Sequence, residues 1–351
     1  MTTFHHVLRR RFVFRSLAAW LAAGSMATAA VPAALAQEGS GAAAASRTPT
    51  GKVPAAVSVL SIVEHPSLDA LRDGLHDELK DAGYQDGKSL HWAYQSAQGN
   101  QGTAVQIARK FVGDRPDVIV PIATPAAQAV VSATHQIPVV YNAITDPIAA
   151  QIVKSMAPSG TNVTGVSDKL VADGQVAFIK QVVPDAKRVG IIYSPAEANS
   201  VSATREMKVA LEKQGISLVE VAAPRSIDVG QAAQRLVGKV DVIYTSNDNN
   251  VISAYESVIK VANAAKIPLI CADRSSVQRG ATGAMAIDYY RMGRQTGRMV
   301  LRILNGEKPG DIASETSDRL DITLNLDAAR RQGATLSPEL QAEASEIFGK
   351  P

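Results

Sequence analysis

Short apolar runs of strand length alternate with longer stretches in which apolar residues recur at helical spacing, from about residue 57 to residue 303. The apolar runs predict strands at residues 57–63, 117–121, 138–144, 189–193, 241–244, 268–271 and 284–288. The helical spacing predicts helices at residues 68–81, 102–111, 126–134, 173–183, 201–214, 229–237, 250–265 and 292–304. Such alternation indicates an α/β protein in which helices cover both faces of parallel sheets.

The residues that follow these apolar runs are small or polar, and after four of five such runs a proline comes next. Thr124 is predicted to cap a helix, and Pro125 to occupy its first position. The unpaired N–H groups and the positive dipole end of such a helix suit a carboxylate or a phosphate. Any strand-to-helix turn has this pattern, but its recurrence indicates the sheet edge at which open α/β folds bind ligands.

An Asp-Val-Ile phrase, a helix and an Ile-Pro phrase follow one another twice, within residues 117–140 and 241–270. We therefore predict two Rossmann-like lobes with parallel sheets, joined by a hinge. The long helix that ends at Asn305-Gly306 would return through the hinge to the first lobe, and residues 319–325 alternate like a strand. The predicted first lobe comprises residues 54–165 and 290–318, and the second comprises residues 166–289 and 319–348.

The first 36 residues have the pattern of an export signal: an arginine-rich start, an alanine-rich apolar run and Ala34-Leu35-Ala36 before the expected cleavage site. Gly24 and Pro32 interrupt the apolar stretch, which disfavours a transmembrane anchor. Residues 37–53 predict a disordered linker. No cysteine stands at the cleavage site, so we expect a protein free in the periplasm and not a lipoprotein. The arginines leave general secretion and twin-arginine export as alternatives.

Composition limits the function classes further. The formal net charge is +3, but the four arginines of the signal leave 32 basic against 33 acidic residues, a net of −1 in the mature chain. Nothing in this balance indicates nucleic-acid binding. The single cysteine, Cys271, lies in an apolar run and predicts a buried thiol with no disulfide. We expect a monomer.

Motifs for catalysis or metal binding are absent from the sequence. The histidines are scattered without a His-x-x-x-His pair, and there is no Gly-x-Ser-x-Gly, no Walker loop and no cysteine cluster. We therefore expect no cofactor, no metal and no enzyme activity.

The polar residues at the predicted strand ends are the candidate ligand contacts. Asp146 and Asp168 are either helix caps or ligand contacts. Asn247, Asp248 and Asp273 follow strands of the second lobe, and Asn199 lies just past another. The first lobe thus offers hydroxyls and helix N–H groups, and the second offers carboxylates and amides. That asymmetry favours a zwitterion with its carboxylate on the first lobe and its ammonium on the second.

Several phrases resemble those of the periplasmic solute-binding proteins of ABC importers with the type I fold, in the tryptophan/tyrosine-binding branch. They are Ile62-Val63-Glu64-His65-Pro66, Ala97-Gln98-Gly99-Asn100, Ala123-Thr124-Pro125-Ala126-Ala127-Gln128, Thr145-Asp146-Pro147, Thr164-Gly165-Val166-Ser167-Asp168, Asp248-Asn249 and Ile287-Asp288-Tyr289-Tyr290. Asn100 departs from the aspartate that the resemblance leads us to expect.

The resemblance implies roles for the candidate residues. Thr124 and Thr145 would hold a ligand carboxylate, and Asp273, with Asp248 nearby, would meet the ammonium. Glu64, Asn199 and Asn247 would orient the ligand. One or two of four tyrosines would line the cleft and stack on an aromatic side chain, while the others pack; the four are Tyr141, Tyr193, Tyr244 and Tyr289.

The expected function is to bind a free amino acid, with an aromatic side chain (Trp, Tyr or Phe) favoured, and to deliver it to an ABC permease in the inner membrane. One alternative is the same fold with another solute, such as a branched amino acid, an amide or a nucleoside. Another is a ligand sensor for a chemoreceptor or a sensor kinase.

Overall fold

The computed structural model describes residues 48–317 and 319–350, which form one compact unit. The predicted signal peptide and most of the predicted linker lie outside the described residues. The described end of that linker contacts the first lobe: the Lys52 N–H donates to Leu304 O at 2.9 Å, and the Lys52 ammonium pairs with Asp117. The prediction of a disordered linker up to residue 53 is therefore wrong at this end.

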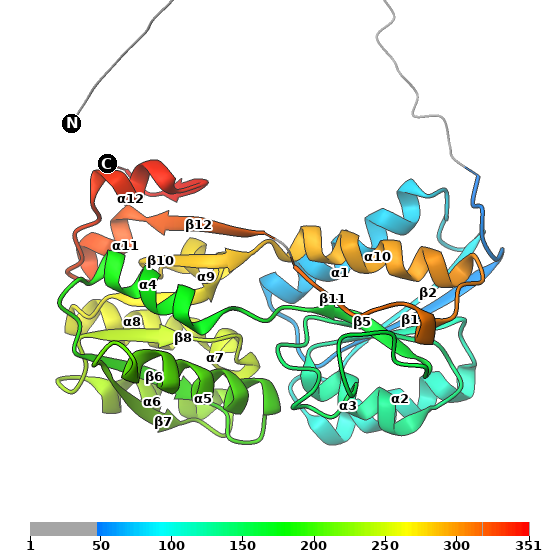
Figure 1. The fold of residues 1–351 in the computed structure, drawn as a ribbon, viewed down its shortest axis with the longest axis horizontal. Helices are drawn as coiled ribbons and strands as arrows, with labels where there is room; N and C mark the ends of the chain where they lie inside the picture. Colours follow the sequence, from blue (N-terminus) through cyan, green and yellow to red (C-terminus); the bar gives the residue numbers. More distant parts are fainter. Residues whose placement is uncertain (1–47, 318, 351) are drawn as a thin grey trace, which may run out of the picture. The chain divides into compact units, whose positions relative to one another are not determined.

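The first lobe is built on a six-stranded parallel sheet in the order β11-β5-β4-β3-β1-β2. Figure 1 shows α1 and α10 on one face of this sheet and α2 and α3 on the other. The strands are β1 (Ala55–Ser61), β2 (Leu90–Ser96), β3 (Val118–Ile122), β4 (Val139–Asn142), β5 (Val163–Ser167) and β11 (Glu315–Thr316). The helices are α1 (Pro66–Asp81), α2 (Gln101–Asp114), α3 (Thr124–Ala133) and α10 (Tyr289–Leu304), followed by the short η2 (Pro309–Asp311).

The second lobe has a seven-stranded sheet in the order β13-β12-β10-β9-β8-β6-β7. Its strands are β6 (Arg188–Tyr193), β7 (Ser217–Ala222), β8 (Val242–Thr245), β9 (Leu269–Asp273), β10 (Gly283–Ile287), β12 (Leu320–Asn325) and β13 (Glu346–Phe348). Its helices are α4 (Ala172–Val182), α5 (Ala198–Glu212), η1 (Ser226–Asp228), α6 (Val229–Leu236), α7 (Asn249–Ser253), α8 (Tyr255–Ala265), α9 (Arg274–Arg279), α11 (Leu326–Arg331) and α12 (Pro338–Glu343). Within this sheet β12 runs antiparallel to β10, and the other pairs are parallel.

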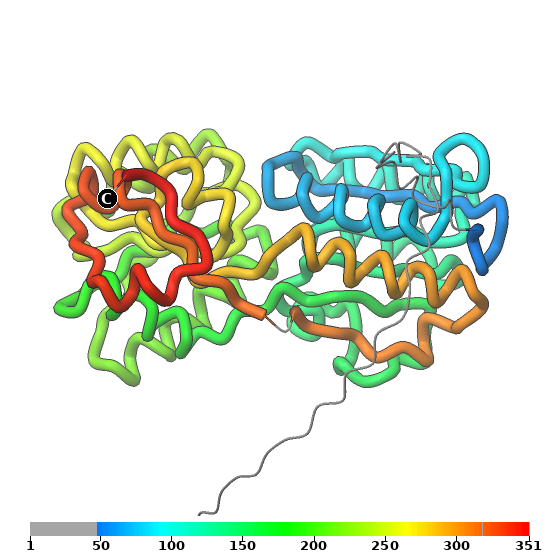
Figure 2. Tube along the Cα trace, turned by 90° about the horizontal axis from the view of Figure 1, so that it is seen from above, coloured from blue at the N-terminus to red at the C-terminus, as the bar shows by residue number. Residues whose placement is uncertain are grey.

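The predicted fold class, two Rossmann-like lobes joined by a hinge, is confirmed, with β12 as an antiparallel addition. The chain passes between the lobes three times: after β5, between β10 and α10, and between β11 and β12. Figure 2 shows α10 lying beside α1. The boundary that we predicted after residue 165 falls inside β5, whose strand continues to Ser167.

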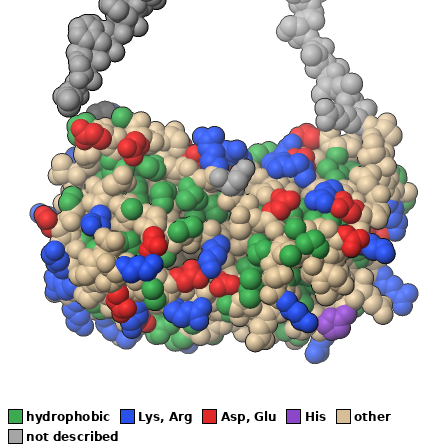
Figure 3. All heavy atoms as spheres, in the orientation of Figure 1, with side chains coloured by type: hydrophobic (Ala, Val, Ile, Leu, Met, Phe, Trp, Pro, Cys, Tyr) green, Lys and Arg blue, Asp and Glu red, His purple; other side chains and the backbone are tan. Residues whose placement is uncertain are grey.

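The predicted helix at residues 250–265 is two helices, because the backbone of Ala254 leaves the helical conformation between α7 and α8. None of the described helices has the length and apolar character needed to cross a membrane. On the face in Figure 3, basic and acidic side chains are interspersed.

Candidate ligand-binding cleft

The two lobes contact each other where strands of both sheets end. Ser67 Oγ, in the first turn of α1, donates to Asp273 Oδ1 at the end of β9 at 2.8 Å. Ser202 Oγ on α5 donates to Asp146 Oδ2, which follows β4, at 2.9 Å. The strand ends that the sequence indicated as a ligand edge therefore border the space between the lobes.

Several side-chain polar atoms at these strand ends are buried and have no hydrogen-bond partner among the described residues. In the first lobe they include Thr124 Oγ1, both amide atoms of Asn142 and His65 Nδ1; in the second they include Asn199 Oδ1, Ser246 Oγ and Asn247 Oδ1. Burying a polar group without a partner is costly, and native proteins have few such groups. Their concentration at this edge marks a site where a polar ligand would supply the missing partners.

The start of α3 differs from the prediction. Its N-cap residue is Ala123, with φ 71° and ψ 156°, and Thr124 is already the first helical residue. The prediction that Thr124 caps the helix is therefore wrong. A non-glycine residue at positive φ is strained, and such strain is frequent at binding sites. Because Ala123 supplies no capping oxygen, N–H groups of the first helical turn remain available next to the buried Thr124 hydroxyl.

Asp273 is 1% exposed and its two carboxylate oxygens have different environments. Oδ1 accepts hydrogen bonds from Ser67 Oγ, from Ser275 Oγ at 2.6 Å and from the Ser276 N–H at 3.0 Å, the last of which caps α9. Oδ2 accepts none from the described residues. Asp273 can therefore offer one buried carboxylate oxygen to a cation in the cleft.

Asp248, the second predicted ammonium partner, uses both oxygens within its own lobe. Oδ2 accepts from the Ser194 N–H at 2.6 Å and from Ser200 Oγ at 2.5 Å. Oδ1 accepts from Ser194 Oγ and from the Val251 N–H, each at 2.9 Å, and so caps α7. Asp248 thus joins the ends of β6 and β8 and has little capacity left for a ligand.

The remaining first-lobe candidates are also engaged. Thr145 Oγ1 donates to Asp168 Oδ1 at 2.9 Å, and Asp146 Oδ1 accepts from the Ala149 N–H at 2.9 Å. Glu64 is exposed and accepts from Tyr94 Oη at 3.2 Å and from Gln98 Nε2 at 2.9 Å. Thr145 and Asp146 border the space between the lobes, whereas the partners of Glu64 lie within the first lobe.

Asp168 is not a helix cap but an acceptor shared by three elements. Besides Thr145, it accepts from Asn247 Nδ2 at 2.9 Å and from Tyr289 Oη at 2.7 Å. Burial raises the pKa of Asp168, although these hydrogen bonds oppose the effect. Asp168 therefore holds together the start of α10, the loop after β4 and the loop after β8.

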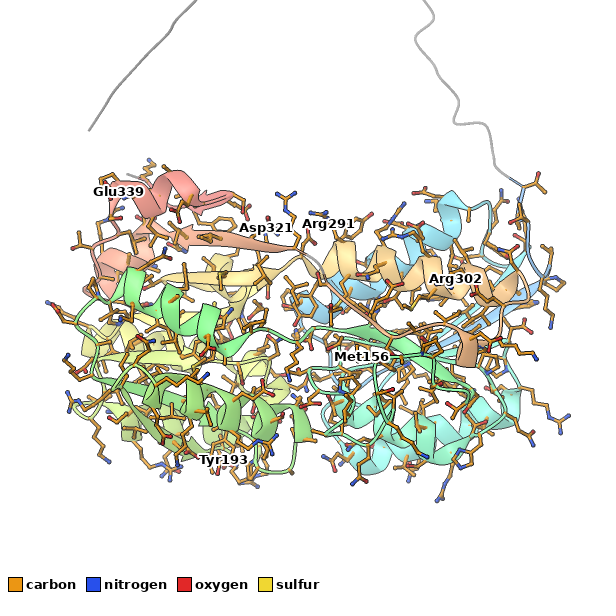
Figure 4. All side chains as sticks on the ribbon, viewed as in Figure 1. Met156, Tyr193, Arg291, Arg302, Asp321 and Glu339 are labelled. Carbon is orange, nitrogen blue, oxygen red and sulfur yellow. The ribbon has the colours of Figure 1, made fainter. Side chains whose placement is uncertain are left out.

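The four candidate tyrosines have different positions. Tyr141 is fully buried in the apolar core of the first lobe, so its expected stacking role is not supported. Tyr289 Oη donates its hydrogen bond to Asp168 Oδ2. Tyr193 lies on the second lobe, as labelled in Figure 4, and borders neither cavity between the lobes described below. Tyr244 lines one of these cavities and donates to Gln175 Oε1 at 3.4 Å.

Two of the cavities among the described residues are lined by both lobes and by candidate ligand contacts. The smaller has a volume of about 30 Å³ and is lined by Thr145, Asp146, Asn247 and Tyr244, among others. The larger, about 270 Å³, is lined by Pro125 and residues 62–63 of the first lobe and by Glu197, Pro224 and Asn249 of the second. We refer to it as the Pro125–Glu197 cavity.

The structure adds three residues that the sequence did not single out as ligand contacts: Asn142, Ser246 and His65. Asn142 was available as a signal, because it is an amide inside an otherwise apolar run. Burial lowers the pKa of His65 to about 4, despite the nearby negative charge of Asp273. The imidazole is therefore neutral at pH 7.

Comparisons with known proteins agree with this architecture. A family model described as ABC transporter substrate binding protein matches residues 56–348. The Tyrosine-binding protein of Clostridioides difficile is 39% identical over 274 residues, which span 78% of this chain and 79% of that protein.

Three solved structures are similar over 84% of this chain. A conserved domain protein from Vibrio cholerae is 46% identical with a TM-score of 0.83, over 99% of that chain. A domain from Streptococcus pneumoniae in complex with L-Trp is 33% identical with a TM-score of 0.81, over 99% of that chain. A ligand-free, open substrate binding protein with adhesive properties from Clostridium difficile is 37% identical, with a TM-score of 0.65 over 100% of that chain.

The family model covers most of the chain, and the resemblance found in the sequence is thereby confirmed. The chain belongs to the family of ABC transporter substrate-binding proteins.

Proposed function

We propose that this protein binds a free L-amino acid with an aromatic side chain between its lobes and delivers it from the periplasm to an ABC permease, after cleavage of the signal peptide behind Ala36. The observation that carries the proposal is a pair of buried groups suited to the two ends of a zwitterion. The Thr124 hydroxyl at the start of α3 suits the carboxylate, and Asp273 Oδ2 suits the ammonium.

The aromatic side chain is inferred from the relatives, and the ligand size is inferred from the volume of the Pro125–Glu197 cavity. One relative is named for tyrosine, and another was solved with L-Trp. The backbone of this chain superposes better on the L-Trp complex, with a TM-score of 0.81, than on the open, ligand-free relative, with a TM-score of 0.65. Its sequence identity to the open relative is nevertheless the higher of the two. The cavity is small by the standard of drug-sized ligands, about 300–1,000 Å³, and suits a single amino acid.

Calorimetry on the mature protein tests the proposal directly. L-tryptophan, L-tyrosine or L-phenylalanine should bind and raise the melting temperature, because a ligand specific to the native state stabilises it by mass action. Chromatography after incubation should return the amino acid unchanged. Leucine, glutamine and adenosine serve as comparison ligands. Binding of one of these in place of the aromatic amino acids, or steady turnover of any of them, would contradict the proposal.

Thr124→Val should weaken binding by about tenfold, because the ligand carboxylate loses one hydrogen bond, about 1–1.5 kcal/mol, and keeps the helix N–H groups. Thr124 is not the N-cap of α3, so the melting temperature of the ligand-free protein should change little. Calorimetry and a thermal melt measure the two effects separately. Unchanged affinity would mean that the ligand carboxylate does not bind to this hydroxyl.

A further inference from the structure

Glu197 is a buried carboxylate that the family assignment leaves without a role. It is 6% exposed and occupies the N-cap position of α5 without capping it. Its Oε2 accepts from Asn199 Nδ2 at 3.1 Å, from the Asn249 N–H at 3.3 Å and from Asn249 Nδ2 at 2.6 Å. Its Oε1 accepts from no group in the described part of the chain, so one oxygen is held fixed by three donors and the other is available.

No lysine or arginine in the described part of the chain forms an ion pair with Glu197. Arg225, which lines the same cavity, pairs instead with Asp228 at 2.9 Å. Burial, followed by the negative charge of Asp248, raises the pKa of Glu197 to about 7. The three amide donors reach only Oε2, so Oε1 of this buried carboxylate still lacks a hydrogen-bond donor among the described residues. The arrangement therefore points to a donor on the ligand side.

The Pro125–Glu197 cavity connects this carboxylate with the start of α3. Its lining is mixed: each lobe contributes polar residues, and the apolar ones are Ile62, Val63 and Pro125 from the first lobe and Ala196 and Pro224 from the second. Pro125 directly follows Thr124, our candidate for the ligand carboxylate. An amino acid anchored there would extend an aromatic side chain between these apolar residues, toward Glu197 on the second lobe.

We propose that Glu197 Oε1 accepts a hydrogen bond from the polar end of the aromatic side chain, an indole N–H or a phenol O–H. Glu197 thereby makes the protein prefer tryptophan and tyrosine to phenylalanine, which has no such donor. This inference rests on the proposed function and assigns to Glu197 the selection of the ligand side chain.

Glu197→Gln is the matched test. Its amide oxygen can take the place of Oε2 and accept from Asn199 and Asn249, while its NH₂ group replaces Oε1 and cannot accept. At pH 8, calorimetry should show that the affinity for tryptophan and tyrosine falls by about tenfold or more, while the affinity for phenylalanine changes by no more than about twofold. Glu212→Gln, on the exposed face of the same helix, is the control and should bind all three like the parent.

Glu197→Asp provides a second variant that keeps the charge but withdraws it by one methylene. It should bind phenylalanine normally and lose the preference for tryptophan. Equal losses for all three ligands in Glu197→Gln, or no loss for any, would overturn the inference. If the parent binds none of the three ligands, the proposed function fails instead, so the two failures are distinguishable.

A pH series gives an independent readout. Protonation of Glu197 removes part of its acceptor capacity, so tryptophan affinity should fall between pH 8 and pH 5.5 by more than phenylalanine affinity does. The neighbouring titratable or charged groups are Asp248 at the start of α7, His65 before α1 and Arg225 before η1, with its partner Asp228. They act on both ligands, so the difference between the ligands isolates Glu197. The difference should disappear in Glu197→Gln, and its persistence there would overturn the inference.

Discussion

Replacement of Asp273 by asparagine is expected to weaken binding of the aromatic amino acid by about 30-fold or more, because a buried ammonium left without its carboxylate costs roughly 2–5 kcal/mol. The amide oxygen of asparagine can keep accepting from Ser67, Ser275 and the Ser276 N–H, as Oδ1 does in the parent. The NH₂ group then replaces Oδ2 and faces the ammonium. Calorimetry with the best of the three ligands measures the loss.

Two further variants serve as controls for Asp273→Asn. Asp173→Asn lies on the exposed face of α4 and should bind like the parent. Asp273→Ala should bind as weakly as Asp273→Asn but also melt lower, since loss of the α9 cap costs on the order of 1 kcal/mol. If Asp273→Asn binds as tightly as the parent, the ammonium lies elsewhere. Glu197 then becomes the next candidate, because the oxygens of Asp248 are already occupied.

The fold could be predicted from the sequence wherever a strand is both buried and apolar along its length. Strands β3, β8 and β9 are buried throughout and appear as continuous apolar runs. Strands β2 and β7 were not predicted, because they lie at the edges of their sheets and are only partly buried. Residues such as His91 and Glu220 interrupt their apolar pattern. Strand β5 was missed for another reason: its sequence, Val-Thr-Gly-Val-Ser, is too polar to resemble a core strand although it is buried.

The sequence predicted the sheet edge at which the candidate site lies, but not which atoms are available to a ligand there. Asp248 and Asp273 both lie at the ends of second-lobe strands and both cap helices, so their positions alone do not distinguish them, and only the family resemblance placed Asp273 first. They differ in how many hydrogen-bond donors reach each carboxylate oxygen. The donors to Asp248 include Ser194 and Ser200, whereas those to Asp273 include Ser67 of the first lobe. Such contacts join residues that are distant in the chain, and single-sequence patterns do not encode them.

The packing of α10 on α1 leads to the largest expected effect on stability. The sequence predicts that this helix returns to the first lobe, but it does not show how closely the two helices approach. A Cβ at Gly293 would lie 2.0 Å from Leu71 O and 2.9 Å from Leu75 N, both backbone atoms that cannot move aside without separating the helices. Gly293→Ala should therefore destabilise the protein by about 3 kcal/mol, because overpacking outweighs the gain of up to about 1 kcal/mol in helix propensity.

Gly113→Ala is the matched control, since it makes the same chemical change in α2 where an added Cβ meets nothing within 4 Å. This variant should be more stable than the parent by about 0.5–1 kcal/mol, because alanine loses less conformational entropy in a helix than glycine does. Thermal melts of the parent and the two variants, in the absence of ligand, measure effects of opposite sign. Equal or higher stability of Gly293→Ala would mean that α1 and α10 do not approach each other as closely as described. The crossing would then have to be held by the side chains around it.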